Sequence, residues 1–197
     1  MPDYFAAFLD LRGRRCVIVG GGPIAARKTE ALLEAGARVT VVSPALTPAL
    51  AALVAARRVV HRPRRFLTTD VRGCALAVAA TGVERVDAAV AAAARRHRAL
   101  VNVVDRPALC DFIVPSVLRR GELQIAVSTG GRVPALAREI RKSLEPLFAP
   151  ACANFVARVG EARARAREGV TSVAERMAAG ERVVALALGE RGRAVEV

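Results

Sequence analysis

Residues 16–28 read CVIVGGGPIAARK, an apolar run that ends in glycines and then resumes as a helix-forming segment. A strand, a glycine turn and a helix in this order are typical of a chain that binds a pyrophosphate. Gly20 permits the tight turn, Gly22 lets the backbone approach the phosphates, and Ala25 keeps helix and strand close. Pro23 suits the first helical turn, where a missing N–H costs nothing. The free N–H groups of that turn and the helix dipole would face the anion.

The flanking residues supply the context that such a motif requires. Gly36 is placed to end the helix, and residues 39–42 read VTVV, which predicts a second strand. The resulting βαβ unit favours a nucleotide site over the alternative, a structural glycine turn in an unrelated α/β protein. The helix is expected to bury a stripe made of Ile24, Ala25, Ala31, Leu32 and Leu33.

Strand and helix signals continue to alternate to about residue 104, which predicts a parallel, doubly wound α/β sheet. Further strands are expected over 59–61, 74–79 and 99–104, and helices over 49–56 and 84–96. In such a sheet the loops at the carboxyl ends of the strands share one crevice. These loops are expected at 20–22, 43–44, 80–82 and 105–107.

Beyond Asp111 the pattern changes. Residues 112–118 and 123–127 are strand-like runs separated by RRGE, which predicts a hairpin, and a helix is expected from Pro134 to about Leu147. The helical patterns that follow are interrupted by glycine, so breaks are expected at Gly160, Gly169 and Gly180. We therefore predict a nucleotide-binding domain over 1–113, a small element over 114–148 and a helical domain over 149–197.

The 197 residues include 31 Lys+Arg and 18 Asp+Glu, which gives a formal net charge of +13. Such an excess suits an acidic partner, which could be nucleic acid, an anionic membrane or a polyanionic small molecule. A GC-rich coding bias towards arginine is an alternative explanation for part of it. Because aromatic residues make up only 4% and tryptophan is absent, little is available to stack on single-stranded bases.

The apolar runs are shorter than the roughly 18 residues that span a bilayer, and the segment after Met1 lacks the basic start of a signal peptide. A cytoplasmic location is expected. The cysteines form no C-x-x-C pair and are expected to be reduced core thiols: Cys16, Cys74, Cys110 and Cys152. His61 and His97 lack ligand spacing, so no permanent metal site is predicted.

Two segments could carry chemistry. Asp105 ends a predicted strand at the mouth of the crevice, where it could accept a proton; it could equally cap the turn before Pro107. The loop 128–131 reads STGG and could offer backbone N–H groups to an anion, or simply cap the next helix. Nearby arginines could pair with carboxylates or form a solvated face: Arg119, Arg120 and Arg132.

The second strand leaves the choice of cofactor open. A site for NAD usually has Asp or Glu about 20 residues beyond the fingerprint to bind the ribose 2′-OH, whereas Ser43 and Pro44 follow the strand here. The Ser43 side chain could bond the ribose hydroxyl instead. Three arginines on the loop after the third strand could reach a 2′-phosphate: Arg62, Arg64 and Arg65.

In this order, these segments resemble the precorrin-2 dehydrogenase and sirohydrochlorin ferrochelatase family, also found as the N-terminal module of siroheme synthases. The resemblance covers about residues 5–148. It rests on FLDL at 8–11, VIVGGG at 17–22, LEAGA at 33–37, VTVV at 39–42, AAT at 79–81, NVVD at 102–105, FIVPS at 112–116, AVSTGG at 126–131 and PALAR at 134–138.

The resemblance implies a Rossmann-type domain, a hairpin-and-helix dimerisation element and a helical C-terminal domain, with an active cleft shared across a homodimer. It implies that NAD⁺ takes a hydride from precorrin-2 to give sirohydrochlorin; some members also insert Fe²⁺ to make siroheme. Asp105 matches the family's catalytic aspartate. The implied cofactor-binding residues are Gly20, Gly22, Pro23, Ile24, Ser43, Pro44 and Thr81, and the implied substrate-binding residues are Ser128, Thr129 and Gly130.

The chain departs from the family in one place: many relatives follow Ala-Ala-Thr with acidic residues, whereas Gly82 and Val83 stand here. A carboxylate-rich macrocycle as substrate would give part of the positive charge a use in steering. Two other functions stay open, a dehydrogenase of another polyanionic substrate and a basic nucleic-acid-binding protein. The second is disfavoured because the charge is spread and no helix-turn-helix is evident, so we expect neither nucleic acid nor membrane as partner.

Overall fold

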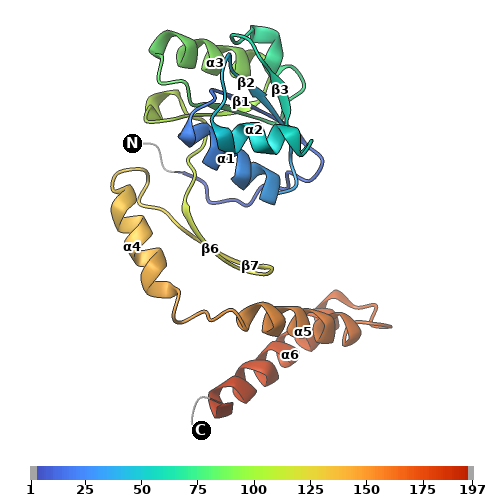
Figure 1. Ribbon diagram of the computed structural model, residues 1–197. Coiled ribbons are helices and arrows are strands. Elements are labelled where there is room, and N and C mark those ends of the chain that lie inside the picture. The colour runs from blue at the N-terminus through green and yellow to red at the C-terminus, as the bar shows by residue number, and fades with distance from the viewer. Residues whose placement is uncertain (1–3, 195–197) are drawn as a thin grey trace. The chain divides into compact units, whose positions relative to one another are not determined.

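The computed structural model describes residues 4–194 of the chain (Figure 1). The fold consists of two compact units, Met1–Val114 and Pro115–Val197. The first holds the parallel sheet and the second a hairpin with helices. The predicted division of the second part near residue 148 stays a prediction.

The sheet of the first unit has five parallel strands in the order β3-β2-β1-β4-β5. Their bounds are β1 Arg15–Val19, β2 Arg38–Val42, β3 Val60–Arg62, β4 Leu76–Ala79 and β5 Leu100–Val103. The predicted doubly wound, Rossmann-type sheet is confirmed. Because the order reverses between β1 and β4, the loops that follow these two strands diverge and leave a crevice between them.

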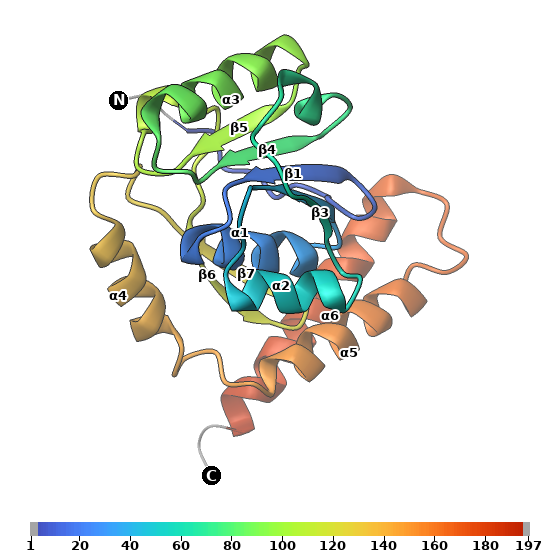
Figure 2. The same ribbon diagram turned by 45° about the horizontal axis from the view of Figure 1, so that its top comes forward.

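Helices cover both faces of this sheet (Figure 2). Helices α1 (Pro23–Glu34) and α2 (Pro48–Ala55) lie on one face and α3 (Glu84–Arg96) on the other. Alternate β1 residues therefore face different cores: Ile18 belongs to the cluster under α1 and α2, and Val17 to the cluster under α3. Two short 3₁₀ helices, η1 (Thr68–Val71) and η2 (Pro107–Leu109), were not predicted.

The buried stripe of α1 differs from the predicted one. Ala25 is buried and Leu32 and Leu33 pack against the core, as expected, but Ile24 is 36% exposed and Ala31 is exposed. Thr29 is buried in the stripe because its Oγ1 donates a 2.8 Å hydrogen bond to the carbonyl of Ala25. A threonine that bonds back to the preceding turn behaves as a core residue, and composition alone does not reveal this.

The second unit begins with the predicted hairpin of β6 (Ser116–Arg120) and β7 (Leu123–Val127), joined at Gly121 with φ +60°. Helix α4 (Pro134–Leu144) follows and contacts both strands. The Arg120 side chain donates through Nε to the carbonyl of Phe148 at 2.6 Å, which ties the hairpin to the segment after α4.

Helices α5 (Cys152–Arg165) and α6 (Val173–Ala194) complete the second unit. The predicted breaks at Gly160 and Gly180 are wrong, since both glycines lie inside these helices. Gly180 leaves room for the side chain of Arg163 on α5, since a Cβ there would lie 2.9 Å from its Nε. The chain does turn at Gly169, where φ is +75°.

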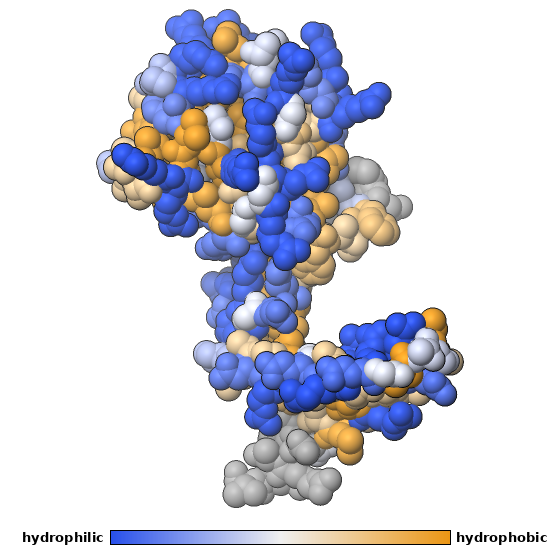
Figure 3. All heavy atoms as spheres, turned by 90° about the vertical axis from the view of Figure 1, so that its right-hand side faces the viewer, coloured by the Kyte–Doolittle hydropathy of each residue, from blue (hydrophilic) through white to orange (hydrophobic). Residues whose placement is uncertain are grey.

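The surface seen in Figure 3 is mainly hydrophilic, with apolar patches between the charged groups. Over the residues that the structure describes, no helix is long and apolar enough to cross a membrane. The four cysteines are free thiols; Cys110 is half-buried and the other three are buried.

Candidate dinucleotide site

A pocket of about 680 Å³ lies at the carboxyl ends of β1, β2 and β4. Its position beside the point where the strand order reverses is where open α/β sheets bind ligands. Five of the predicted cofactor-binding residues line it: Gly20, Gly22, Ser43, Pro44 and Thr81. Pro23 and Ile24 are not among its lining residues.

Each of the three glycines in the turn has a different reason to lack a side chain. At Gly20 φ is +128° and a Cβ would lie 2.3 Å from the carbonyl oxygen of Ala80. At Gly21 a Cβ would lie 1.9 Å from the carbonyl oxygen of Ala45. At Gly22, which lines the pocket, a Cβ would meet nothing within 4 Å. The open space in front of Gly22 is a cradle that fits a pyrophosphate, so the residues present fit a dinucleotide.

Helix α1 starts directly from this cradle. Gly22 is its N-cap and Pro23 its first residue, with no acidic side chain in the first turn. The first-turn amides of a helix lack acceptors within the helix, and those of Ile24 and Ala25 follow the proline here. These N–H groups and the positive end of the helix dipole favour an anion at Gly22.

Ser43 contributes differently from the expectation. Its Oγ donates a 2.7 Å hydrogen bond to the carbonyl of Ala45, and the residue is only 8% exposed. With its proton engaged, the hydroxyl can offer a ligand only its acceptor lone pairs. The carbonyl of Ser43 lies 2.9 Å from Nε2 of His61 on β3.

The opposite edge of the pocket is built from the turn after β4. Thr81 Oγ1 donates to Oδ1 of Asp87 at 2.6 Å and also accepts from the amide of Val83 at 3.0 Å. Asp87 lies in the first turn of α3 and is 2% exposed. Sequence reasoning missed this carboxylate, although an acid four residues from the start of a predicted helix was a usable signal.

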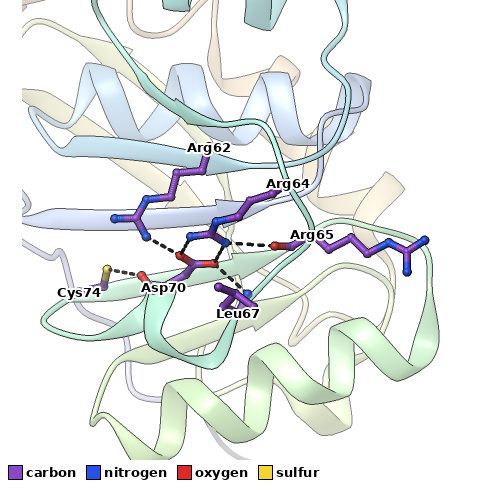
Figure 4. A network of polar contacts seen from close by, with 6 residues as sticks. All are labelled: Arg62, Arg64, Arg65, Leu67, Asp70 and Cys74. Atoms are coloured by element: carbon purple, nitrogen blue, oxygen red, sulfur yellow. Dashed lines mark hydrogen bonds and ion pairs between the residues drawn. The ribbon is translucent and has the colours of Figure 1, made fainter.

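A second buried carboxylate organises the segment between β3 and η1 (Figure 4). The side chain of Asp70 is fully buried and accepts hydrogen bonds from Arg62, Arg64 and the amide of Leu67. Burial opposes ionisation, but these bonds, led by Arg64, outweigh it and lower the pKa of Asp70 from 3.8 to about 2. Arg65 and Phe66, which the same segment carries, line the pocket.

Asp105 lies in the turn after β5 with φ +59°, is exposed, and is not a lining residue of the pocket. The nearby Lys28 of α1 was not singled out as a site residue. Burial lowers the pKa of Lys28, as does the neighbouring Arg27, whereas Cys110 and Asp105 act in the opposite direction. A half-buried ammonium thus lies within electrostatic reach of the candidate base.

The predicted substrate-binding residues belong to the second unit, in the loop between β7 and α4. Ser128 Oγ accepts from the amide of Gly130 at 3.1 Å, and Thr129 Oγ1 accepts from the amide of Val133 at 3.2 Å. Two of the amides that could have bound an anion are therefore already satisfied by side chains. These bonds hold the loop itself and do not cap α4, whose N-cap is Val133 with no side-chain capping hydrogen bond. The substrate role of Ser128 and Thr129 stays a prediction.

The comparisons with known proteins agree with this geometry. Residues 7–116 match the family described as putative NAD(P)-binding, and residues 120–146 match the one described as sirohaem biosynthesis protein, central. The chain belongs to the putative NAD(P)-binding family. The expected family resemblance is confirmed, and the cofactor class is a nicotinamide dinucleotide, with NAD and NADP not separated.

Two relatives are siroheme synthases. That of Thioalkalivibrio sulfidiphilus is 46% identical over 80% of this chain and 32% of its own length. Siroheme synthase 1 of Aeromonas salmonicida is 39% identical over 98% of this chain and 42% of its own length. This chain therefore spans less than half the length of these relatives.

A solved structure described as SirC, precorrin-2 dehydrogenase, shares the fold. The TM-score is 0.76 with 24% identity, and the match covers 92% of this chain and 89% of that one. At this identity the match establishes the fold, which includes the parallel sheet, the hairpin and the helices.

Proposed function

We propose that this chain is an NAD⁺-dependent dehydrogenase that oxidises precorrin-2 to sirohydrochlorin in siroheme biosynthesis. The observation that carries the proposal is the cradle at Gly22, which opens on the 680 Å³ pocket in a chain whose family is NAD(P)-binding. The siroheme synthase relatives support the choice of a tetrapyrrole substrate. A bound nicotinamide would supply the hydride acceptor.

The residues of the chain would divide the remaining work. The Gly20–Gly22 turn and the start of α1 would hold the pyrophosphate, while Ser43 and Thr81 border the two sides of the pocket. Oxidation of the macrocycle also releases a proton, and we assign its acceptance to the carboxylate of Asp105. The exposed position of Asp105 leaves this carboxylate accessible to a large substrate.

Insertion of Fe²⁺ into sirohydrochlorin is proposed as a second step, with the metal as substrate. The name siroheme synthase, which the relatives carry, supports it. Chelation must strip protons from pyrrole nitrogens, so it needs a base near the macrocycle's centre, and Asp105 would serve both steps.

We also propose that the chain forms a homodimer through α4. Apolar side chains of this helix and its flanks are exposed, namely Val133, Leu136, Ile140 and Leu147. Leu136 and Ile140 are four residues apart and share one helix face, which a partner would cover. Light scattering should report twice the monomer mass. Leu136→Asp with Ile140→Asp should give a folded monomer, whereas a wild-type monomer would contradict the dimer.

The experiment that tests the function uses the pure protein with precorrin-2 and NAD⁺, with and without Fe²⁺, and follows the absorption of the chromophore. Conversion to sirohydrochlorin that requires NAD⁺ supports the dehydrogenase, and a further change on adding Fe²⁺ supports the chelatase. We expect NAD⁺ to be preferred in catalysis. A kcat/KM about tenfold higher with NADP⁺, equivalent to about 1.4 kcal/mol, would contradict that choice.

A polyanionic substrate other than precorrin-2 would appear as NAD⁺ binding without turnover of the tetrapyrrole. Nucleic-acid binding is tested by titrating DNA at increasing salt. Micromolar binding at physiological salt with a steep salt dependence would favour that function instead.

A further inference from the structure

One wall of the dinucleotide pocket is made by the segment between β3 and η1, residues 63–67. Phe66 packs against the core cluster beneath α3 and also lines the pocket. Arg65 lines the pocket beside it. The only other arginine among the lining residues is Arg85 of α3.

The neighbouring arginines, Arg62 and Arg64, are both paired with the carboxylate of Asp70. Arg64 makes a two-pronged contact with its carboxylate, Nη1 to Oδ2 at 2.8 Å and Nη2 to Oδ1 at 2.7 Å, and Arg62 donates to the same Oδ1. Arg64 Nη1 also donates to the carbonyl of Arg65 at 3.0 Å. Arg65 is thus held by its backbone, while its side chain points away from the Asp70 carboxylate (Figure 4). Its guanidinium has no hydrogen bond or ion pair with any residue between 4 and 194.

This wall begins next to the end of β2. The amide of Ser43 donates to the carbonyl of Arg62 at 3.2 Å. In dinucleotide sites the residue at the end of the second strand faces the ribose of the adenosine, where a carboxylate selects a 2′-OH and an arginine accommodates a 2′-phosphate. Here Ser43 follows the strand, and the unpaired charged group on the adjoining wall is the guanidinium of Arg65.

We propose that Arg65 is a cofactor-discriminating residue that lets the pocket accept a 2′-phosphate, and that Asp70 is the positioning residue that presents it. The proposal rests on the proposed function in that the pocket must hold a nicotinamide dinucleotide. Both NAD⁺ and NADP⁺ should then bind, because the wall attracts a phosphate and no carboxylate repels it. Arg62 and Arg64 take no part in binding, since their guanidinium groups are held by Asp70.

Calorimetry with NAD⁺ and with NADP⁺ tests this on the full chain. The wild type should bind NADP⁺ within about tenfold of NAD⁺. Arg65→Ala should weaken NADP⁺ binding by about tenfold or more and NAD⁺ binding by less than about threefold, since only NADP⁺ loses a charge-assisted contact. Arg72→Ala is the matched control: Arg72 is exposed just after η1, does not line the pocket, and should change neither affinity.

Asp70→Asn tests the positioning role by the same measurement. When Asp70→Asn is added to Arg65→Ala, NADP⁺ affinity should fall no further than in Arg65→Ala alone. Circular dichroism reports whether the Asp70→Asn variants fold. Equal losses for both cofactors in Arg65→Ala, or no loss of NADP⁺ binding, would overturn the inference. So would a wild type that binds NAD⁺ but not NADP⁺. A wild type that binds neither cofactor would overturn the proposed function and this inference together.

Discussion

The hydroxyl of Thr81 donates a 2.6 Å hydrogen bond to the buried carboxylate of Asp87, and the Thr81 amide reaches the same oxygen at 3.3 Å. The bond joins the end of β4 to the first turn of α3 and so fixes one edge of the dinucleotide pocket. Its removal would leave a carboxylate that is 2% exposed with fewer partners. A buried acceptor that loses its donor costs more than the bond itself contributes.

Thr81→Val keeps the shape of the side chain and removes the donor. We expect the free energy of unfolding in urea to fall by about 1–3 kcal/mol and dinucleotide affinity to fall with it. Thr69→Val, at an exposed position in η1, is the control and should change neither. If the two variants lowered the free energy of unfolding equally, the hydrogen bond between Thr81 and Asp87 would not contribute to stability as argued.

Gly22→Asp should abolish dinucleotide binding while leaving the protein folded. The new side chain has room, because nothing lies within 4 Å of its Cβ, but it places a negative charge in the phosphate cradle. Gly21→Ala is the contrasting variant. Its Cβ would lie 1.9 Å from a carbonyl oxygen, so it should destabilise the fold itself. Unchanged NAD⁺ affinity of Gly22→Asp by calorimetry would remove this turn from the site.

Acid should destabilise the first unit through Asp70. Its pKa in the folded protein, about 2, lies below the ordinary value of 3.8, so its ionisation stabilises the fold above about pH 4. This contribution, about 1–2 kcal/mol after allowance for the partly exposed arginines, is lost as pH falls from 4 to 2. Urea unfolding across this pH range measures the free energy of unfolding of both proteins. It should depend less steeply on pH in Asp70→Asn than in the wild type. Parallel curves would contradict the assignment.

The sequence predicted those parts of the fold in which local signals and tertiary structure agree. Helix α3 has the predicted bounds, Glu84–Arg96, because its apolar period and its length agree. The hairpin followed equally directly from the turn at Gly121. The predictions at Gly160 and Gly180 were wrong because a glycine weakens a helix without necessarily ending it. Only at Gly180 does a neighbouring helix come close, through the side chain of Arg163, whereas a Cβ at Gly160 would meet nothing within 4 Å.

The candidate site was predictable where it is made of backbone. Gly20 and Gly22 could be assigned because their role depends on the absence of a side chain. The roles of Arg65 and Asp70 could not be assigned, since three arginines lie close together at 62, 64 and 65 and only the packing of η1 decides which of them the carboxylate holds. Pro23 and Ile24 belong to the motif but do not line the pocket, a difference that needs coordinates.

After two of the helices, the residue that follows the C-cap is an arginine, where glycine is the usual residue. Arg57 after α2 and Arg98 after α3 have φ of +55° and +57°, whereas Gly36 occupies the corresponding place after α1. Arg57→Gly should therefore raise the free energy of unfolding by about 0.5–1 kcal/mol, and Gly36→Ala should lower it by about 1 kcal/mol. Thermal unfolding measures the stability of both variants. A lower melting temperature for Arg57→Gly would contradict the inference that the positive φ of Arg57 is strained.

Asp105→Asn should separate catalysis from binding. Asparagine, like aspartate, tolerates the positive φ of +59° found here, so the turn should keep its shape. The amide cannot accept a proton, and dehydrogenation should fall by about 10²-fold or more, while NAD⁺ binding and dimerisation persist. Turnover with NAD⁺ and calorimetry measure the two effects.

Glu34→Gln, the same change of charge at the exposed end of α1, is the control for this experiment and should keep wild-type turnover. A loss of NAD⁺ affinity in Asp105→Asn equal to the loss of turnover would point to a distorted turn rather than a missing base. If the variant keeps wild-type turnover, Asp105 only caps the turn after β5. The proton must then pass to water or to the substrate's own carboxylates.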